Sequence, residues 1–329
     1  MDFRHPRQMG DTVETVQVDY DPRLLEEVVL RAIRGGVEER DFRASRDRIY
    51  EEPDVEVRDQ AFRAFHIAWF GRLGLGVPIE RALAERTILA DSVIRCVVAP
   101  ACSKKEEGAD LFVAPPRGDG SEQRSIGIQI RAESFLEPDA VLELLRHEFL
   151  HLADMLNPAF EYEPELPHPE GGAMARRMLQ DRYRALWDIT IDGRLVREGR
   201  APVGVRDRRL NDFARAFPML GEKTEAAFTR FFQASFPTHS ELLACALAPS
   251  EILAGCVEAG SRDLRCPICN FPTYVFEPDP EALEDGVVAR IIQDFSDWQP
   301  TQGICVQCAD LYRALPLSEA AEKQLPRIV

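Results

Sequence analysis

The sequence lacks any apolar run long enough to cross a membrane, which takes about 18 residues or more. Its first residues, MDFRHPRQMGD, also lack the apolar segment of a secretion signal. From these two absences we expect a cytoplasmic protein. Structural disulfides are rare in that reducing compartment, so paired cysteines are better interpreted there as metal ligands.

The sequence also has fewer positively charged than negatively charged residues. The chain has 40 Lys and Arg residues against 56 Asp and Glu residues, which gives a formal net charge of −16. Such a balance disfavours broad attraction to phosphate backbones or to anionic lipid. We therefore expect neither a nucleic acid nor a membrane as partner, and the sequence leaves the oligomeric state open.

The chain contains no internal repeat and no low-complexity tract. Its 329 residues, 45% of them hydrophobic, suffice for about two domains with a sizeable core. Hydrophobic periodicity predicts an α+β fold with a few short strands among many helices. We expect strands at residues 92–99, 109–114 and 126–132, and helices at 22–33, 54–73, 79–89, 138–157, 172–197, 211–235 (broken near Gly221) and 240–259.

An HExxH motif, His147-Glu148-Phe149-Leu150-His151, lies within the predicted helix at 138–157. Residues four apart on a helix differ by about 40° in azimuth and about 6 Å in rise, so both imidazoles project from one face. The helix is apolar nearly all round, and buried imidazoles and carboxylates need a partner that satisfies them. A divalent cation held by His147 and His151, with Glu148 beside it, meets that need.

A catalytic zinc site takes three protein ligands and keeps one position open. The predicted helix at 172–197 offers Asp188 and Asp192, which are again four apart and share a face. One of them is expected to bind the metal while the other fixes a histidine ring, and the residues leave open which does which. Asp154 and His168 are weaker candidates for the third ligand.

A strand, then an HExxH helix, then a helix with paired acidic residues resembles the zincin metallopeptidases, and their gluzincin-like branch in particular. The resemblance implies a small mixed sheet with an HExxH active-site helix in mostly helical surroundings. It also implies a catalytic zinc ion held by His147, His151 and Asp188, with Asp192 supporting a ligand. The string Trp187-Asp188-x-x-x-Asp192 is similar to a WNxxxD motif of small bacterial putative metallopeptidases, in which the second acidic residue would be the ligand.

The activity that this resemblance implies is hydrolysis of peptide bonds in a protein or peptide substrate. A zinc-activated water would attack the carbonyl, with Glu148 as general base and then as acid. Residues 126–132 could form an edge strand that aligns an extended substrate. The side chains of suitable type for stabilising the oxyanion are Tyr162, His168, Tyr183 and His239. Hydrolysis of a non-peptide bond and a catalytically inactive protein-interaction module stay open as alternatives.

Two CxxC motifs, Cys266-Pro-Ile-Cys269 and Cys305-Val-Gln-Cys308, are separated by 35 residues (270–304). Four thiolates in two such pairs are typical of a tetrahedral structural zinc site. The arrangement resembles a zinc ribbon, here with a helix expected at 286–298. The other four cysteines have no ligand spacing and are expected in the core: Cys96, Cys102, Cys245 and Cys256.

A ribbon that follows an HExxH domain is similar to the SprT-like proteases, some of which act on DNA-bound proteins. Those proteases use a third histidine, which this sequence lacks at the corresponding place, and the net charge of −16 argues against a surface that binds DNA. The predicted organisation is an N-terminal extension at 1–55, a zincin-like domain at 56–240, and a helical segment with the four-cysteine zinc ribbon at 241–329.

Overall fold

The computed structural model describes residues 16–114, 123–169, 172–249, 265–271, 273 and 276–322. None of the helices among these residues combines the length and apolarity needed to cross a membrane. The chain divides into two compact units, Met1–Pro158 and Ala159–Val329. The domain boundaries expected near residues 55 and 240 stay predictions.

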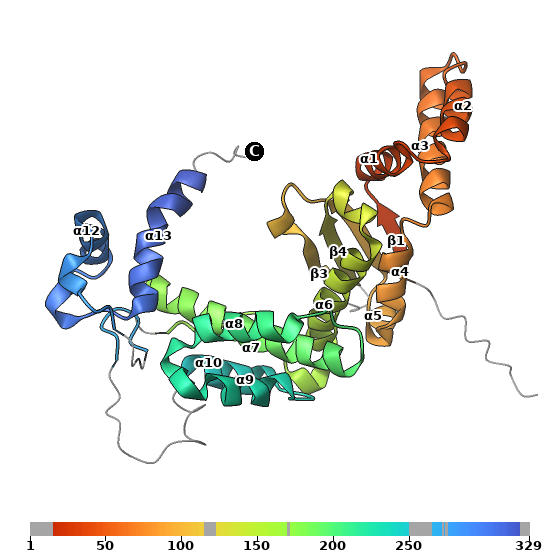
Figure 1. Cartoon of the computed structure of the whole chain (residues 1–329). Helices are drawn as coiled ribbons and strands as arrows, with labels where there is room; N and C mark the ends of the chain where they lie inside the picture. Colours follow the sequence, from red (N-terminus) through yellow and green to blue (C-terminus); the bar gives the residue numbers. More distant parts are fainter. Residues whose placement is uncertain are drawn as a thin grey trace, which may run out of the picture. The chain divides into compact units, whose positions relative to one another are not determined.

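Unit 1 is an α+β unit with a four-stranded mixed sheet, which confirms the predicted class (Figure 1). The sheet order is β1-β2-β4-β3; β1 and β4 pair parallel to β2, and β3 pairs antiparallel to β4. The elements are β1 (Gln17–Tyr20), α1 (Pro22–Ile33), α2 (Glu39–Ile49), α3 (Val55–Arg72), α4 (Val77–Ala84), α5 (Thr87–Ser92), β2 (Arg95–Pro100), β3 (Gly108–Ala114), β4 (Gln123–Ile130) and α6 (Pro138–Leu156).

The predicted edge strand is wrong. Strand β4, which contains most of residues 126–132, has β2 on one side and β3 on the other, so it is an inner strand. Its apolar residues Ile126, Ile128 and Ile130 are buried on one face of the sheet. Alternation with period two marks a half-buried strand but says nothing of its neighbours, and the edge of the sheet beside β4 is β3.

Helix α6 packs its apolar side against the core of unit 1. Leu145, Phe149 and Leu152 are buried in one cluster with the apolar side chains of α1 and of the sheet. Arg146, the residue before the HExxH motif, forms two short bonds with Glu85 at the end of α4, at 2.7 and 2.8 Å, and both side chains are largely buried. Such a bidentate pair fixes the rotation of α6 and so the direction in which the motif points.

Unit 2 consists of helices around the long helix α7 (Gly172–Arg197). Figure 1 shows α8, α9 and α10 gathered along α7. The other helices among the described residues of this unit are α8 (Val205–Ala216), α9 (Thr224–Phe232), α10 (His239–Leu247), α12 (Asp285–Asp294) and α13 (Val306–Glu322). Glycine is required at one point of this packing, since a Cβ on Gly193 would lie 1.9 Å from the backbone oxygen of Phe232.

Most predicted helices are confirmed with small shifts of their ends. The helix expected at 79–89 is two helices, α4 and α5, and the break at Gly221 separates α8 from α9 with a positive φ of 51°. The expected helix at 240–259 begins as α10, and its second half lies outside the described residues. Strand β1 and helices α2 and α13 were not expected from the sequence.

We expect Gly193→Ala to destabilise the protein by about 3 kcal/mol, because α7 and the end of α9 must separate to admit the methyl group. Gly286→Ala in α12 is the matched control, since a Cβ there meets no atom within 4 Å. It should change the free energy of unfolding by no more than about 1 kcal/mol. Urea unfolding measures both, and equal stabilities of the two variants would contradict the close packing.

Candidate metal centres

The HExxH residues lie on the side of α6 that faces away from the apolar core. His147, Glu148 and His151 are half-buried, whereas Phe149 and Leu150 between them are buried. The Nε2 atoms of His147 and His151 are 3.2 Å apart. Two nitrogens bound to one tetrahedral zinc at about 2.0–2.1 Å lie about 3.3 Å apart. The two rings therefore already have the separation that a shared metal ion requires.

Glu148 lies beside the start of β3. Its Oε2 is 3.7 Å from the point where a Cβ on Gly108 would stand, which is ordinary van der Waals distance. Gly108 is the first residue of β3. The carboxylate of Glu148 is thus next to both imidazoles in sequence and next to the edge of the sheet in space.

The acidic pair of unit 2 is built around one arginine. Arg209 of α8 donates from Nε to Asp192 Oδ2 at 2.5 Å and from Nη1 to Asp188 Oδ2 at 3.0 Å. Burial disfavours the charge of Arg209, but Asp188 and Asp192 outweigh it and raise the pKa of the guanidinium. Asp192 is buried and Asp188 is half-buried, so the two carboxylates share a partner but differ in access to solvent. Asp154, a weaker candidate for the third ligand, is buried near the end of α6.

Three of the four candidate oxyanion residues lie in one aromatic cluster. Tyr183 Oη and His239 Nδ1 are 2.7 Å apart, and Tyr162 packs against His239 and Trp187. Tyr183 and His239 are buried, and burial lowers the pKa of His239 and raises that of Tyr162. His168, the fourth candidate, is exposed. Burial in this cluster gives Tyr183 and His239 a role in the core of unit 2.

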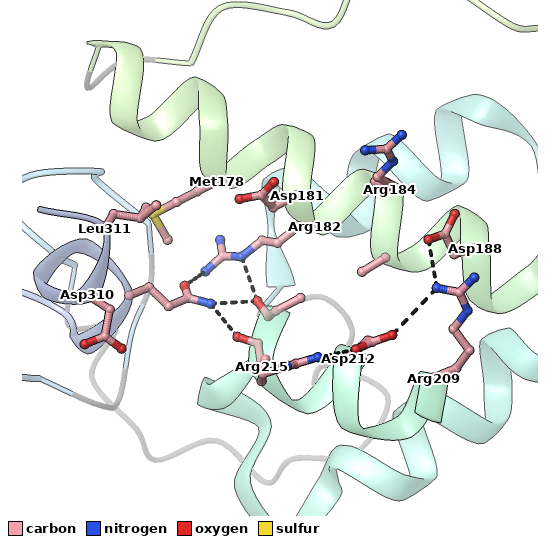
Figure 2. A pocket seen from close by; sticks show the side chains of 13 residues that line it. Met178, Asp181, Arg182, Arg184, Asp188, Arg209, Asp212, Arg215, Asp310 and Leu311 are labelled. Atoms are coloured by element: carbon pink, nitrogen blue, oxygen red, sulfur yellow. Dashed lines mark hydrogen bonds and ion pairs between the residues drawn. The ribbon is translucent and has the colours of Figure 1, made fainter. Parts of the chain in front are cut away.

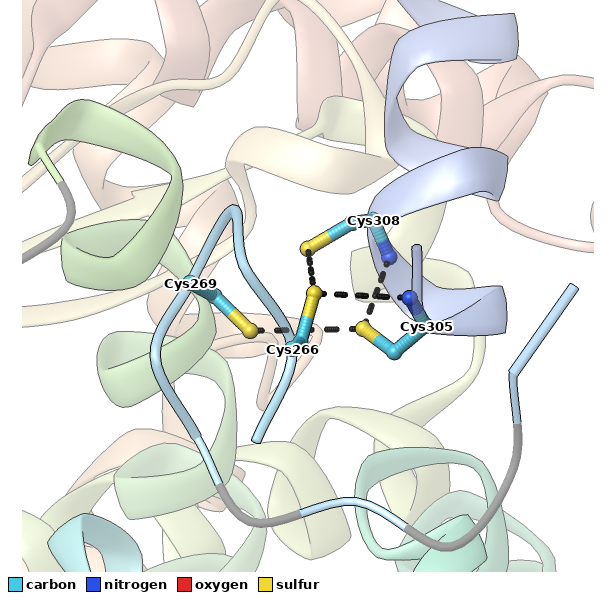
Figure 3. Close-up of side chains that lie close together, drawn as sticks. All are labelled: Cys266, Cys269, Cys305 and Cys308. Atoms are coloured by element: carbon cyan, nitrogen blue, oxygen red, sulfur yellow. Dashed lines mark hydrogen bonds between the residues drawn. The ribbon is translucent and has the colours of Figure 1, made fainter. Parts of the chain in front are cut away.

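The four cysteines of the two CxxC motifs meet in the interior of unit 2. Their sulfurs lie within 4.8 Å of one another, and all four residues are buried. The Sγ–Sγ distances Cys266–Cys308 and Cys269–Cys305 are 4.0 Å, close to the separation of about 3.8 Å between sulfurs of a zinc tetrathiolate (Figure 3). A disulfide bond is about 2.05 Å long, so these sulfurs are too far apart to be paired as disulfides.

The electrostatics of this four-cysteine cluster, defined as Cys266, Cys269, Cys305 and Cys308, also fit a cation. Hydrogen bonding with the other three thiols, Cys269 first, lowers the pKa of Cys266, whereas bonding with Cys266 raises the pKa of Cys308. The four groups compete for ionisation, and a divalent cation is what stabilises all four as thiolates. The four-cysteine cluster could therefore hold a metal ion such as zinc.

The architecture around the four-cysteine cluster departs from the expected ribbon. The second CxxC motif leads directly into α13, and the β-pairing among the described residues of this region is one isolated bridge, Phe276–Cys305. The backbone amides of Cys305 and Cys308 donate to the sulfurs of Cys266 and Cys305, both at 3.4 Å (Figure 3). The helix expected at 286–298 is confirmed as α12.

The other cysteines are only partly as expected. Cys96 is fully buried in the core of unit 1, as predicted. Cys102 is exposed, so its assignment to the core is wrong, because it lies in the turn that follows β2. Cys245 is half-buried, and Cys256 lies outside the described residues.

Comparison with protein-family models, with curated proteins and with solved structures finds no match. The resemblance to zincins accordingly depends on the motifs and on the geometry described above.

We expect Arg209→Met to destabilise the protein by about 3–5 kcal/mol, because it leaves the buried carboxylate of Asp192 without its cation. Arg206→Met on the same helix is the control. Arg206 pairs with Glu225, and their side chains are 43% and 69% exposed, so its loss should cost less than about 1 kcal/mol. Urea unfolding measures the stability of both variants. Similar losses of unfolding free energy would mean that the ion pairs of Arg209 stabilise the protein no more than the exposed pair of Arg206.

Replacement of one ligand of the four-cysteine cluster, Cys305→Ser, should remove one divalent metal ion per chain relative to the wild type, since three thiolates leave the tetrahedron incomplete. Cys102→Ser is the control because Cys102 is exposed and distant in sequence from both motifs. Plasma mass spectrometry of purified protein gives the metal content. Equal metal content in the two variants would contradict the metal site.

Proposed function

We propose that the protein is a zinc-dependent metallopeptidase of zincin type. The observation that carries the proposal is the pair of Nε2 atoms of His147 and His151, 3.2 Å apart on α6, with Glu148 next to them at the edge of the sheet. Two imidazoles at tetrahedral separation and one accessible carboxylate are the parts that hydrolytic zinc sites use. Binding of a peptide in particular is supported by the edge strand β3.

The third ligand in this proposal is Asp188. Asp188 offers a carboxylate oxygen and, like His147 and His151, is half-buried. Asp192 is less suited because it is buried against Arg209. Its role is to hold Arg209, which in turn donates to one oxygen of Asp188 and orients that carboxylate.

When bound at this donor set, zinc lowers the pKa of water and polarises a carbonyl group. Glu148 is placed to accept the proton of the attacking water and to return it to the leaving amine. Among the strands that the structure describes, β3 pairs with β4 alone, so its other side offers backbone N–H and C=O groups to an extended peptide. Gly108 brings the start of that strand next to Glu148, which would align the scissile bond with the base.

The four-cysteine cluster has a structural role in this proposal, with zinc as its metal. Four protein ligands fill the tetrahedron and leave no position for a substrate. Sulfurs that stand 4.0 Å apart as free thiols agree with a reducing compartment, and we place the protein in the cytoplasm.

Glu148→Gln should reduce cleavage of a peptide library by about a thousandfold or more while the metal content stays at the wild-type value, because the amide keeps the shape of the side chain but cannot accept the proton. Glu143→Gln, on the same helix and half-buried, is the control and should cleave normally. Unchanged cleavage by Glu148→Gln would remove it from the mechanism. Metal-loaded wild type that cleaves no peptide would favour a binding protein or a hydrolase of another bond.

Asp188→Asn and Asp192→Asn separate the ligand from its support. Asp188→Asn should cost about 10–100-fold or more in affinity for the metal ion at the histidine pair, whereas Asp192→Asn should mainly lower stability. Titration with a competing chelator, in protein whose four-cysteine cluster is already loaded, measures the first effect. A larger loss of affinity in Asp192→Asn would reverse the two roles.

A further inference from the structure

We propose that Arg182 is the counter-cation of the four-cysteine cluster: its guanidinium neutralises part of the negative charge of a tetrathiolate that holds a divalent metal, and so ties metal occupancy to the packing of helix α7. Four thiolates and one divalent cation carry a net charge of −2. A buried arginine with no acidic partner is the complement of such a centre. The inference depends on the four-cysteine cluster and is independent of the proposed peptidase activity.

Arg182 is an unusual residue of unit 2, since it is charged and only 2% exposed. Its guanidinium donates from Nε to the backbone oxygen of Ala216 at 3.3 Å and from one terminal nitrogen to Gln307 Oε1 at 3.0 Å (Figure 2). The other terminal nitrogen, Nη1, is buried and has no hydrogen-bond partner. Among the residues that the structure describes, no carboxylate oxygen lies within 4.0 Å of this guanidinium to balance its charge.

Both CxxC motifs reach Arg182. The guanidinium carbon lies 4.4 Å from the ring centre of Phe271, two residues after Cys269. Gln307, its hydrogen-bond partner, stands between Cys305 and Cys308 in the second motif. One turn earlier on α7, Met178 Sδ is 3.7 Å from Cys308 Sγ. Residues 178 and 182 therefore form a face of α7 that covers the four-cysteine cluster.

The electrostatics point to the same partner. Burial lowers the pKa of Arg182, and the charges that oppose this effect come from the four cysteines, Cys269 first. If all four sulfurs were neutral thiols, the positive charge would be buried without compensation. With a divalent metal and four thiolates, the cluster supplies the negative charge that the surroundings of Arg182 lack.

Arg182 and Asp188 line the same cavity of unit 2. This cavity of about 500 Å³ is lined by Arg182, Gln307, Asp188 and Arg209, among other residues. Figure 2 shows Arg182 and Asp188 at different points along α7. Arg182 and Asp188 are six residues apart on α7, about 9 Å along the helix.

The test compares thermal unfolding of the full-length protein with and without metal at the four-cysteine cluster, for the wild type, Arg182→Met and Arg182→Gln. Arg184→Met, an exposed arginine on the same helix, is the matched control. We expect both Arg182 variants to unfold at lower temperature than the wild type when zinc is bound, and at higher temperature when zinc has been removed with the thiols reduced. The sign reverses because the charge is compensated only in the zinc-bound state.

A second readout isolates the cluster from any other metal site. With cobalt in place of zinc, only thiolate-bound cobalt gives an intense near-ultraviolet charge-transfer band, and its decay in excess chelator measures release from the four-cysteine cluster. We expect release about tenfold faster in Arg182→Met and close to wild type in Arg182→Lys, which keeps the charge. Equal release in Arg182→Met and the wild type, or equal release in the Met and Lys variants, would overturn the proposal.

A purely structural role for Arg182 would lower stability by the same amount in both metal states, and that result, or failure to fold in both states, also overturns the proposal. None of these readouts measures peptide cleavage. A result with Glu148→Gln that contradicts the peptidase activity would therefore not affect the proposed role of Arg182. A result that contradicts the role of Arg182 would likewise not affect the proposed peptidase activity.

Discussion

The buried charges of helix α7 are the constraint on which unit 2 depends. Arg182 near its middle and Asp192 near its end are both almost fully buried, and each needs a partner of opposite sign. Asp192 has Arg209, held at 2.5 Å, and Arg182 contacts Gln307 and Phe271 beside the cysteines of the cluster. The apolar residues around them specify that α7 is buried, but these two charges determine which elements must pack on it, namely α8 on one side and the two CxxC motifs on the other.

Unit 1 also contains a buried ion pair that orients a helix. The bidentate pair Arg146–Glu85 fixes the rotation of α6, and the Nε2 atoms of the two imidazoles of the motif lie 3.2 Å apart. A helix that buries Leu145 and Phe149 on one side while it presents two histidines and a glutamate on the other is organised for a ligand. In the proposed function that ligand is zinc, and the neighbouring edge strand β3 adds the means to bind an extended chain.

The sequence predicted helices α6 and α7 because both are long and strongly patterned, and the spacing of the two CxxC motifs predicted that their four cysteines would gather in one cluster. It did not predict α2, whose only buried residue is Phe42, or β1, which has four residues and is defined by its pairing with β2. The order of the strands in the sheet could not be predicted from the sequence, because alternation of apolar and polar residues at 126–132 fits an inner strand as well as an edge strand. The burial of Arg182 and Arg209 was not predicted, because a charged residue on a helix is normally expected to face solvent. The neighbours of Arg182 at positions 179, 183 and 186, which are apolar or aromatic, were a signal that it is buried.

In the proposed function the protein binds two metal ions, one at the histidine pair of α6 and one at the four-cysteine cluster. Anomalous diffraction at the zinc edge from crystals of the full chain tests it most directly. We expect two peaks, one about 2.3 Å from all four cysteine sulfurs and one about 2.0–2.1 Å from the Nε2 atoms of His147 and His151. A single peak at the four-cysteine cluster, with the two imidazoles bonded only to each other, would contradict the proposed catalytic centre.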